Sequence, residues 1–253
     1  MTQPLKQRLL GGETVFGFWH MTASPMVAEI LAQAGYDTCI IDMEHGAGSY
    51  MDAQTSAQAM AASGCQPLLR VPVTNRVEIK RALDIGAVGV VCPGIASVAE
   101  AEEAARACRY PPNGVRGMAP TIVRPARYGS IWQDYIDQAD RDVICICQVE
   151  TKAAVDSIDE IAAIDGVDML FIGPMDLSGD LGQRGQPDHP IVDEAMAKVA
   201  AAAKKNGKAL GSIPTAGRGR DALLAAGYSC IIADADVALL RDGAAASLAR
   251  LRG

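Results

Sequence analysis

Aromatic residues are scarce in this sequence, and long apolar runs are missing. Phe, Trp and Tyr make up 4% of the 253 residues, whereas hydrophobic residues make up 49%. A core must therefore be built chiefly from Ala, Val, Ile, Leu and Met, which suits parallel strands covered by helices. No apolar run reaches the roughly 18 residues of a membrane-spanning helix, and the segment from Met1 to Lys6 does not resemble a secretory signal. We therefore expect no membrane partner.

Clustered positive charge and paired cysteines are also missing. The formal net charge is −7, which argues against a nucleic-acid or anionic-membrane partner, because phosphate binding needs clustered Lys and Arg. A single local Arg can still hold an anionic substrate. The seven cysteines show no C-x-x-C spacing, and most lie in apolar runs, where buried free thiols are expected: Cys39, Cys92, Cys145, Cys147 and Cys230. We therefore expect a reducing, cytoplasmic location.

Short apolar runs alternate with helical patterns along the whole chain, which is typical of repeated βα units. Helices are predicted between most of the strands, for example at 25–34, 97–107 and 192–205. The eight predicted strands cover residues 15–19, 38–42, 67–71, 89–93, 142–149, 168–173, 208–213 and 229–233. No G-x-G-x-x-G turn follows the first strand to suggest a dinucleotide fold. The pattern predicts an α/β protein with one (β/α)₈ TIM-barrel domain over residues 1–253.

Local signals predict where some helices begin and end. Ser97 with Glu100 three residues later predicts a capping box. Asn206-Gly207 predicts a helix end, with the glycine at positive φ, and His189 before Pro190 marks a helix start. The longest irregular stretch, residues 110–128, lies beyond the helix after strand four. We expect it to form a wall or lid that reaches the site, with a disordered excursion as the alternative.

Polar residues gather at the carboxyl ends of the predicted strands, where the active sites of TIM barrels lie. These residues lie at or just beyond the strand ends: Trp19-His20 at strand one, 42–46 at strand two, Arg70 at strand three, 148–150 at strand five, 173–176 at strand six, and Asp234 with Asp236 at strand eight. The opposite ends of the strands hold few comparable clusters. The pattern therefore predicts an active site at this end of the barrel.

Glu150 and Asp176 follow strands five and six, which are neighbours in a barrel. Two carboxylates without a nearby Cys or His ligand pair suit a hard divalent cation that water and substrate oxygens complete. The structural alternative is that Glu150 is a favourable first-turn acid and Asp176 caps a short helix.

Arg70 and His45 are the candidates for binding and proton transfer. Arg70 ends an apolar run and needs a partner, because an isolated buried charge is costly. It forms an internal ion pair with Glu44 or Asp42, or it binds a carboxylate or a developing enolate oxygen. His45 suits proton transfer near neutral pH, with a structural hydrogen bond as the alternative.

Two other chemistries find little support. A Schiff-base aldolase needs a lysine at a strand's carboxyl end, but Lys208 begins strand seven, roughly 20 Å from that end. Residues 211–219 are rich in glycine but lack the G-x-x-x-x-G-K pattern, and the loop after strand eight is acidic. A phosphate site is therefore not expected there.

Several motifs together resemble one known family. They are Ile41-Asp42-Met43-Glu44-His45, Leu69-Arg70-Val71-Pro72, Leu83-Asp84-Ile85-Gly86-Ala87, Arg109-Tyr110-Pro111-Pro112, Gln148-Val149-Glu150-Thr151 and Phe171-Ile172-Gly173-Pro174 followed by Asp176-Leu177-Ser178. In this order they resemble the HpcH/HpaI aldolases, which are metal-dependent 2-oxo-acid aldolases. The resemblance implies that Glu150 and Asp176 ligate Mg²⁺, Mn²⁺ or Co²⁺. It also implies that Arg70 stabilises a pyruvate enolate and that His45 is the acid/base.

The resemblance extends to further residues and to assembly. Asp42 joins the catalytic set, and Asp84 is implied to reach the histidine of a neighbouring subunit in a homohexamer built as paired trimers. The residues implied to contact substrate are Trp19, Arg70, Arg124, Gln148, Gly173, Pro174, Met175 and Asp176. Two departures concern the pocket: Met175 stands where many relatives carry Ala, and residues 123–127 differ from the usual Ala-rich stretch.

The expected function is that of a class II aldolase, a carbon–carbon lyase. Its donor would be pyruvate or a similar 2-oxo acid such as hydroxypyruvate, and its acceptor would be an aldehyde. The alternatives are a citrate-lyase-like enzyme acting on a CoA ester, a non-catalytic barrel that binds an oxo acid, and a phosphosugar isomerase. The first would need a basic surface for CoA, and the last would need a phosphate loop.

Overall fold

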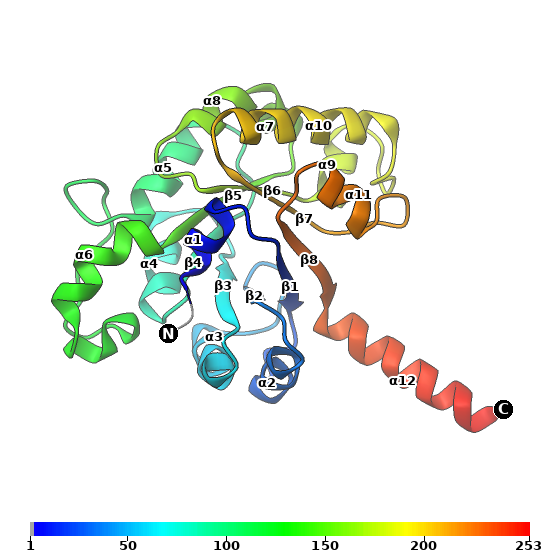
Figure 1. Ribbon diagram of the computed structural model, residues 1–253, viewed down its shortest axis with the longest axis horizontal. Helices are drawn as coiled ribbons and strands as arrows, with labels where there is room; N and C mark the ends of the chain where they lie inside the picture. Colours follow the sequence, from blue (N-terminus) through cyan, green and yellow to red (C-terminus); the bar gives the residue numbers. More distant parts are fainter. Residues whose placement is uncertain (1–2) are drawn as a thin grey trace.

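Eight parallel strands close into a barrel in which each strand pairs with its sequence neighbours and β1 pairs with β8 (Figure 1). The structure, a computed structural model, describes residues 3–253, so Met1 and Thr2 of the N-terminal segment discussed above lie outside it. The strands are β1 (Val15–His20), β2 (Thr38–Asp42), β3 (Gln66–Arg70), β4 (Gly89–Cys92), β5 (Ile144–Val149), β6 (Met169–Ile172), β7 (Ala209–Ser212) and β8 (Cys230–Ala235). The TIM-barrel prediction is confirmed.

Helices connect and surround the strands. The α-helices are α1 (Leu5–Leu10), α2 (Pro25–Gln33), α3 (Tyr50–Ala59), α4 (Arg76–Asp84), α5 (Val98–Cys108), α6 (Trp132–Asp142), α7 (Lys152–Asp156), α8 (Ile158–Ala163), α9 (Pro174–Asp180), α10 (Pro190–Lys205), α11 (Arg220–Ala225) and α12 (Asp236–Arg252). Two short 3₁₀ helices, η1 (Met60–Ala62) and η2 (Arg124–Gly129), complete the set. Within residues 3–253, no helix is long and apolar enough to cross a membrane.

Apart from the last three residues of β8, the strands are largely buried on both faces, which explains why they appear in the sequence as apolar runs rather than as alternating patterns. One set of side chains fills the barrel interior, including Ile40, Leu68 and Phe171. The other set packs between strands and helices, with Ile41 and Leu69 among its members. All seven cysteines are buried free thiols, which confirms the prediction for the five in apolar runs and extends it to Cys65 and Cys108.

Helix ends agree with the sequence signals, with two corrections. Gly207 has φ of +64° after α10, and the His189 side chain caps the start of that helix. Ser97 caps α5, but the carboxylate of Glu100 accepts from the amide of Ala96, so the reciprocal bond of a capping box is not made. Strand five begins at Ile144 rather than 142, because the helical pattern of α6 continues through Asp142.

Residues 110–128 do not line the cavities at the carboxyl end of the barrel. The expectation that they form a wall or lid over the site of their own chain is therefore wrong. The stretch leads into η2, which packs against α4 and α6 on the outside of the barrel. Its Arg116 is fully buried and bonds Asp84 at 2.8 Å. Its guanidinium also lies over the ring of Tyr110, 4.6 Å from the ring centre. These contacts hold the stretch in an ordered position, so it is not a disordered excursion.

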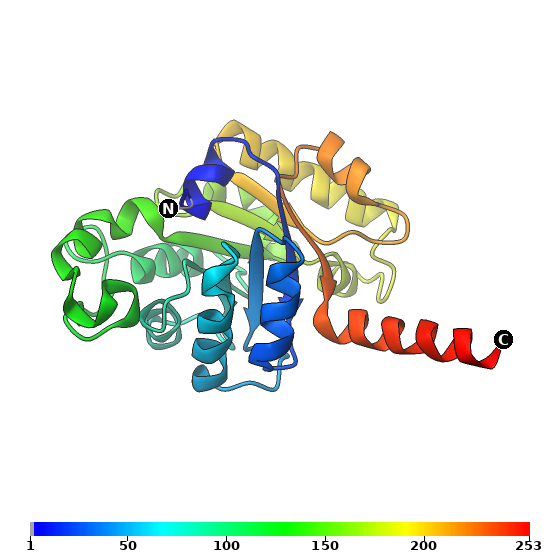
Figure 2. The same cartoon turned by 60° about the horizontal axis from the view of Figure 1, so that its bottom comes forward.

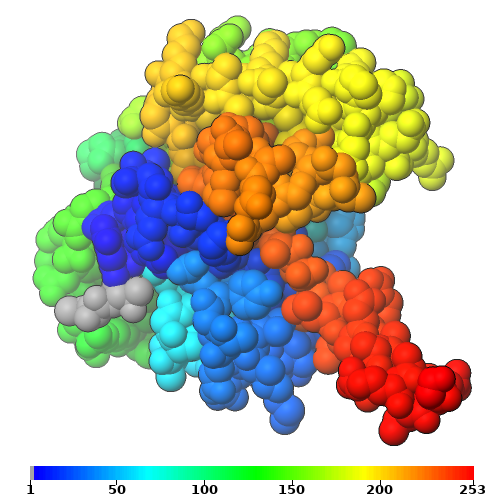
Figure 3. Space-filling model, turned by 45° about the vertical axis from the view of Figure 1, so that its right-hand side comes forward, coloured from blue at the N-terminus to red at the C-terminus, as the bar shows by residue number. Residues whose placement is uncertain are grey.

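Helix α12 does not pack along the barrel as the preceding helices do. It leaves the end of β8 and projects away from the body (Figures 1 and 2), and it protrudes in the space-filling view (Figure 3). Its start is fixed by Asp236, a buried carboxylate that accepts bonds from His20 Nδ1 at 2.9 Å and from the amide of Met21 at 3.0 Å. Burial alone would raise the pKa of Asp236, but the bonds from His20 and Thr22 outweigh it and hold this pKa well below its ordinary value. Every residue from Leu240 onward is exposed.

Candidate active site

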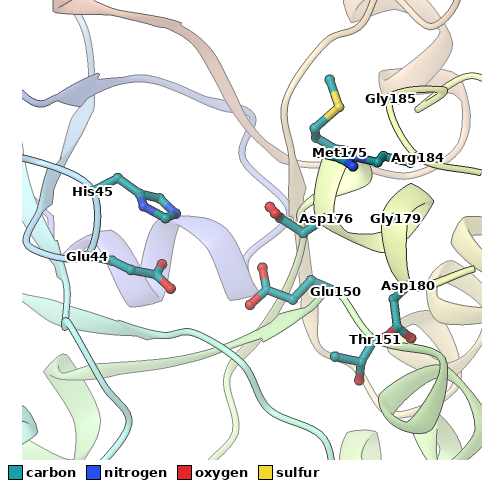
Figure 4. Close-up of a pocket in the computed structure, with 10 residues that line it drawn as sticks. All are labelled: Glu44, His45, Glu150, Thr151, Met175, Asp176, Gly179, Asp180, Arg184 and Gly185. Atoms are coloured by element: carbon teal, nitrogen blue, oxygen red, sulfur yellow. The ribbon is translucent and has the colours of Figure 1, made fainter.

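A cavity of about 790 Å³ opens at the carboxyl ends of the strands (Figure 4). Its lining residues come from the segments after β2 and β5 and from α9 with the loop that follows it: Glu44, His45, Glu150, Thr151, Met175, Asp176, Gly179, Asp180, Arg184 and Gly185. A smaller recess of about 190 Å³ shares His45, Met175 and Asp176 with it and continues inward to Trp19, Arg70 and Gln148. Most of the polar residues predicted to gather at this end therefore share one site, but His20, Asp234 and Asp236 do not line it.

Arg70 is held at the base of this site by two carboxylates. Its Nε and Nη2 donate to the two oxygens of Asp42 at 2.9 and 2.7 Å, and its Nη1 lies 3.0 Å from Glu44 Oε2. The guanidinium also stacks over Trp19, 4.4 Å from the ring centre. The internal ion pairs considered from the sequence are both present, yet Arg70 still lines the recess. Such a fixed, nearly buried cation suits binding of an anionic oxygen.

Asp42 also shapes the turn that carries His45. Its Oδ1 accepts from the backbone amides of Glu44 at 3.0 Å and His45 at 3.3 Å. The same carboxylate therefore orients Arg70 and the turn after β2. Figure 4 shows the His45 ring on the opposite side of the cavity from Asp176, with Glu44 below it. His45 is exposed, so its imidazole can meet a ligand in the cavity.

Glu150 is positioned by neighbours on both sides. Its Oε1 accepts from the backbone amide of Gly94, just after β4, at 2.7 Å. Its Oε2 accepts from Gln148 Nε2. Gln148 is buried, and its Oε1 has no hydrogen-bond partner within residues 3–253. A buried acceptor without a partner is costly, so a donor on a bound ligand would satisfy it.

Asp176 lies in the first turn of α9, and Gly173 precedes this helix. A Cβ at Gly173 would lie 3.2 Å from Glu150 Oε2, 3.6 Å from Asp176 Oδ2 and 3.5 Å from Gln148 Nε2. Both carboxylates therefore point at the same small space beside the Gly173 backbone. Glycine keeps that space open, and any larger residue would crowd it.

Burial and mutual repulsion disfavour the charged forms of two carboxylates in the site, Glu150 and Glu44. Burial raises the pKa of Glu150, and the negative charges of Asp176 and Glu44 raise it further, against hydrogen bonds from Gly94 and Gln148 that lower it. Burial likewise raises the pKa of Glu44, while the positive charge of Arg70 lowers it. Negative charge is therefore concentrated around the cavity, and a bound cation would relieve it.

The remaining predicted residues divide into two groups. Trp19, Gly173, Met175 and the other recess residues lie together, and Pro174 is buried at the start of α9. Asp84 and Arg124 do not line the cavity of their own chain. Asp84 pairs with Arg116, whereas Arg124 Nη1 donates to the carbonyl of Ile85 at 3.1 Å. These two residues therefore lie near each other on the outside of the barrel.

Three charged lining residues were not singled out from the sequence as site residues. Glu44 was considered only as a partner of Arg70, and its place in the motif around His45 was the available signal. Asp180 and Arg184 lie in and after α9. No motif marks them: helix α9 brings Asp180 to the cavity, and the chain that follows this helix brings Arg184.

The site and the fold agree with the comparisons to known proteins. Residues 15–242 match the profile of the HpcH/HpaI aldolase/citrate lyase family. The chain belongs to this family. A 2-dehydro-3,6-dideoxy-6-sulfogluconate aldolase from Pseudomonas putida is 37% identical over 94% of this chain and 92% of its own length. A hydroxypyruvate/pyruvate aldolase from Roseobacter denitrificans is 38% identical over 93% of this chain and 91% of its own.

Structural comparison leads to the same family. The crystal structure of an HpcH/HpaI aldolase/citrate lyase family protein from Burkholderia cenocepacia aligns with a TM-score of 0.92 and 40% identity, covering 98% of this chain and 99% of that one. Since the relatives are aldolases, this family member is a carbon–carbon lyase. The alternative of a non-catalytic oxo-acid-binding barrel is therefore wrong.

Proposed function

We propose that residues 1–253 form one metal-dependent aldolase domain that joins or separates a pyruvate-like 2-oxo acid and an aldehyde. The observation that carries the proposal is the meeting of Arg70, His45, Glu150 and Asp176 around one cavity. The donor, pyruvate or hydroxypyruvate, is supported by the name of the Roseobacter relative. We also propose a reducing location such as the cytoplasm, because the thiols are free.

Glu150 and Asp176 fit a divalent cation. Their oxygens are hard donors that converge beside Gly173, and their accumulated negative charge favours a cation. Within residues 3–253 no cluster of three or more acidic, His or Cys ligands is present, so water and substrate would supply the other ligands. Mg²⁺, Mn²⁺ or Co²⁺ held here would supply Lewis-acid polarisation of the substrate's 2-oxo group.

The chain's own residues perform the remaining steps of the proposed reaction. In the cleavage direction His45 takes the proton from the 4-hydroxyl, the C4–O bond becomes a carbonyl, and the electron pair of the C3–C4 bond passes into an enolate. Arg70 stabilises the negative enolate oxygen. A proton returned to C3 then yields the 2-oxo acid, and the C4 fragment leaves as an aldehyde. Formation of the bond runs through the same steps in reverse.

A direct assay tests this function. The purified protein with Mn²⁺ is incubated with a racemic 4-hydroxy-2-oxo acid, and pyruvate release is followed with a lactate dehydrogenase couple. We expect metal-dependent pyruvate release and, in the reverse direction, a 4-hydroxy-2-oxo acid formed from pyruvate and an aldehyde. If neither reaction occurs with Mg²⁺, Mn²⁺ or Co²⁺, the proposal is wrong, and CoA esters become the next substrates to test.

We also propose that the chain works as a homo-oligomer, a hexamer of paired trimers. The supporting observation is helix α12, which projects from the barrel with Val237, Leu240, Leu248 and Leu251 exposed along one side. Met26 and Ile30, one turn apart on α2, are exposed as well. Such apolar surfaces on a single chain are typical of subunit contacts. In this assembly Asp84, as the resemblance implies, and the nearby Arg124 would act on a neighbouring subunit's site.

Placing charge on α12 is expected to break this assembly. The double variant Leu240→Glu with Leu248→Glu should shift the protein from hexamer to smaller species in light scattering coupled to size-exclusion chromatography, because buried charges oppose association. Asp242→Asn, at an exposed position on the opposite face of the same helix, is the control and should leave the mass unchanged. A wild-type protein that is monomeric at all concentrations would contradict the proposal.

A further inference from the structure

Arg184 is a cation at the rim of an otherwise acidic cavity. Its neighbours in the lining include four carboxylates, Glu44, Glu150, Asp176 and Asp180. Figure 4 shows Arg184 beside Met175, on the same side of the cavity as Asp176. The side chain is exposed, and no carboxylate pairs with it in the part of the chain that the structure describes. The reaction proposed above gives this residue no role.

The segment that carries Arg184 is anchored at both ends. On the N-terminal side of Arg184, the backbone amide of Gln183 donates to the carbonyl of Ser178 at 2.7 Å. On the C-terminal side of Arg184, the carboxylate of Asp188 accepts hydrogen bonds from the backbone amide of Gly217 at 2.9 Å and from the Thr215 hydroxyl. Asp188 thereby ties this segment to the backbone of the glycine-rich stretch after β7. The connection therefore holds Arg184 at the cavity.

Charge and position indicate what Arg184 would bind. The inner part of the site, around Arg70 and the paired carboxylates, is where the proposed 2-oxo acid donor binds. The aldehyde must then extend outward past Met175, toward the rim. A neutral tail leaves Arg184 in water. A carboxylate or sulfonate at the far end of the aldehyde would accept paired hydrogen bonds from the guanidinium.

We propose that Arg184 determines acceptor specificity, favouring short aldehydes that carry a carboxylate or sulfonate at the end distant from the carbonyl. This inference rests on the proposed function, because it concerns the second substrate of that reaction. Arg184 acts on binding of the tail and takes no part in proton transfer. Its removal should therefore raise KM for an anionic acceptor while kcat and the reaction with a neutral acceptor are retained.

A matched pair of acceptors tests the proposal. The wild-type enzyme with Mn²⁺ and pyruvate is given either 4-oxobutanoate or pentanal, which has a similar length and no charge. In Arg184→Gln, kcat/KM for 4-oxobutanoate should fall about 10- to 100-fold, the range for losing a charge-assisted bond. The rate with pentanal should change less than about twofold, because its neutral tail makes no charged hydrogen bond that the substitution could remove. Arg184→Lys should retain part of the preference for the anion.

Arg106→Gln is the control for a general change in surface charge. Arg106 is exposed in the last turn of α5, away from the residues that line the cavity, and its removal should leave both acceptors unaffected. An unchanged ratio between the two acceptors in Arg184→Gln overturns the inference and leaves the proposed function standing. If the wild-type enzyme forms product with neither aldehyde, the proposed function fails and the inference fails with it.

Discussion

Replacing Arg70 with alanine is expected to lower kcat/KM for aldol cleavage by about 10²- to 10³-fold, as for other residues that stabilise charge in a transition state. The guanidinium is oriented in advance by Asp42 and Glu44 and lines the recess where the enolate would form. A water molecule in its place would carry no charge and would have to reorient during the reaction. The measurement is steady-state pyruvate release from a 4-hydroxy-2-oxo acid.

The same substitution disturbs the fold, so two controls are needed. Without Arg70 the buried carboxylate of Asp42 loses its bidentate partner, which can cost about 3–5 kcal/mol. Thermal unfolding should therefore be recorded, and activity compared only where the variant is folded. Arg70→Lys keeps a positive charge but cannot bond two oxygens of Asp42 in parallel, so we expect intermediate activity. A folded Arg70→Ala enzyme with wild-type activity would remove Arg70 from the mechanism.

Stripping the enzyme with EDTA is expected to reduce aldol activity to background, and adding Mg²⁺, Mn²⁺ or Co²⁺ should restore it. The reason is the pair of carboxylates that converge beside Gly173, whose charge a divalent cation would neutralise. Ligand binding stabilises the folded state by about 2.7 kcal/mol at a hundred times Kd, so metal should also raise the melting temperature. Activity that is indifferent to EDTA would contradict the roles of Glu150 and Asp176.

Variants of the two carboxylates separate metal binding from other effects of EDTA. In Glu150→Gln and Asp176→Asn, both the binding of Mn²⁺ measured by calorimetry and the metal-induced rise in melting temperature should be lost. Asp180→Asn is the matched control, because Asp180 lines the same cavity but accepts a bond from the amide of Lys152. It should bind Mn²⁺ like the wild-type enzyme. Equal binding by all three variants would place the metal elsewhere.

Much of the site could be predicted because, in a TIM barrel, the place of a residue at a strand end already tells on which side of the barrel it lies. All strands end at the same side of the barrel, so Arg70 at the end of β3 and Glu150 just after β5 had to face one opening. The register pairs Asp42 with Arg70 across β2 and β3, which is the contact that the structure uses to orient the guanidinium. The sequence left open whether Arg70 was structural or functional, and the structure shows that its internal ion pairs still leave it facing the recess.

Other features depend on where the loops and helices between the strands pack. The direction of α12 rests on the buried contact between His20 and Asp236, residues that are far apart in the chain. The stretch before η2 packs outside the barrel because Arg116 is buried against Asp84 and Tyr110. Arg184 reaches the cavity because Asp188 fixes its segment to the loop after β7. None of these contacts has a local sequence signature.

The alternation of apolar runs and helices by itself determined the barrel, and the polar residues at strand ends determined where its site lies, because periodicity and strand direction are local properties of the chain. Only the tertiary structure decided which carboxylates converge beside Gly173, which residues stay outside the cavity, and which cation stands at its rim. Those distances are set by long-range packing, in which one buried ion pair or hydrogen bond outweighs any preference of the segment itself.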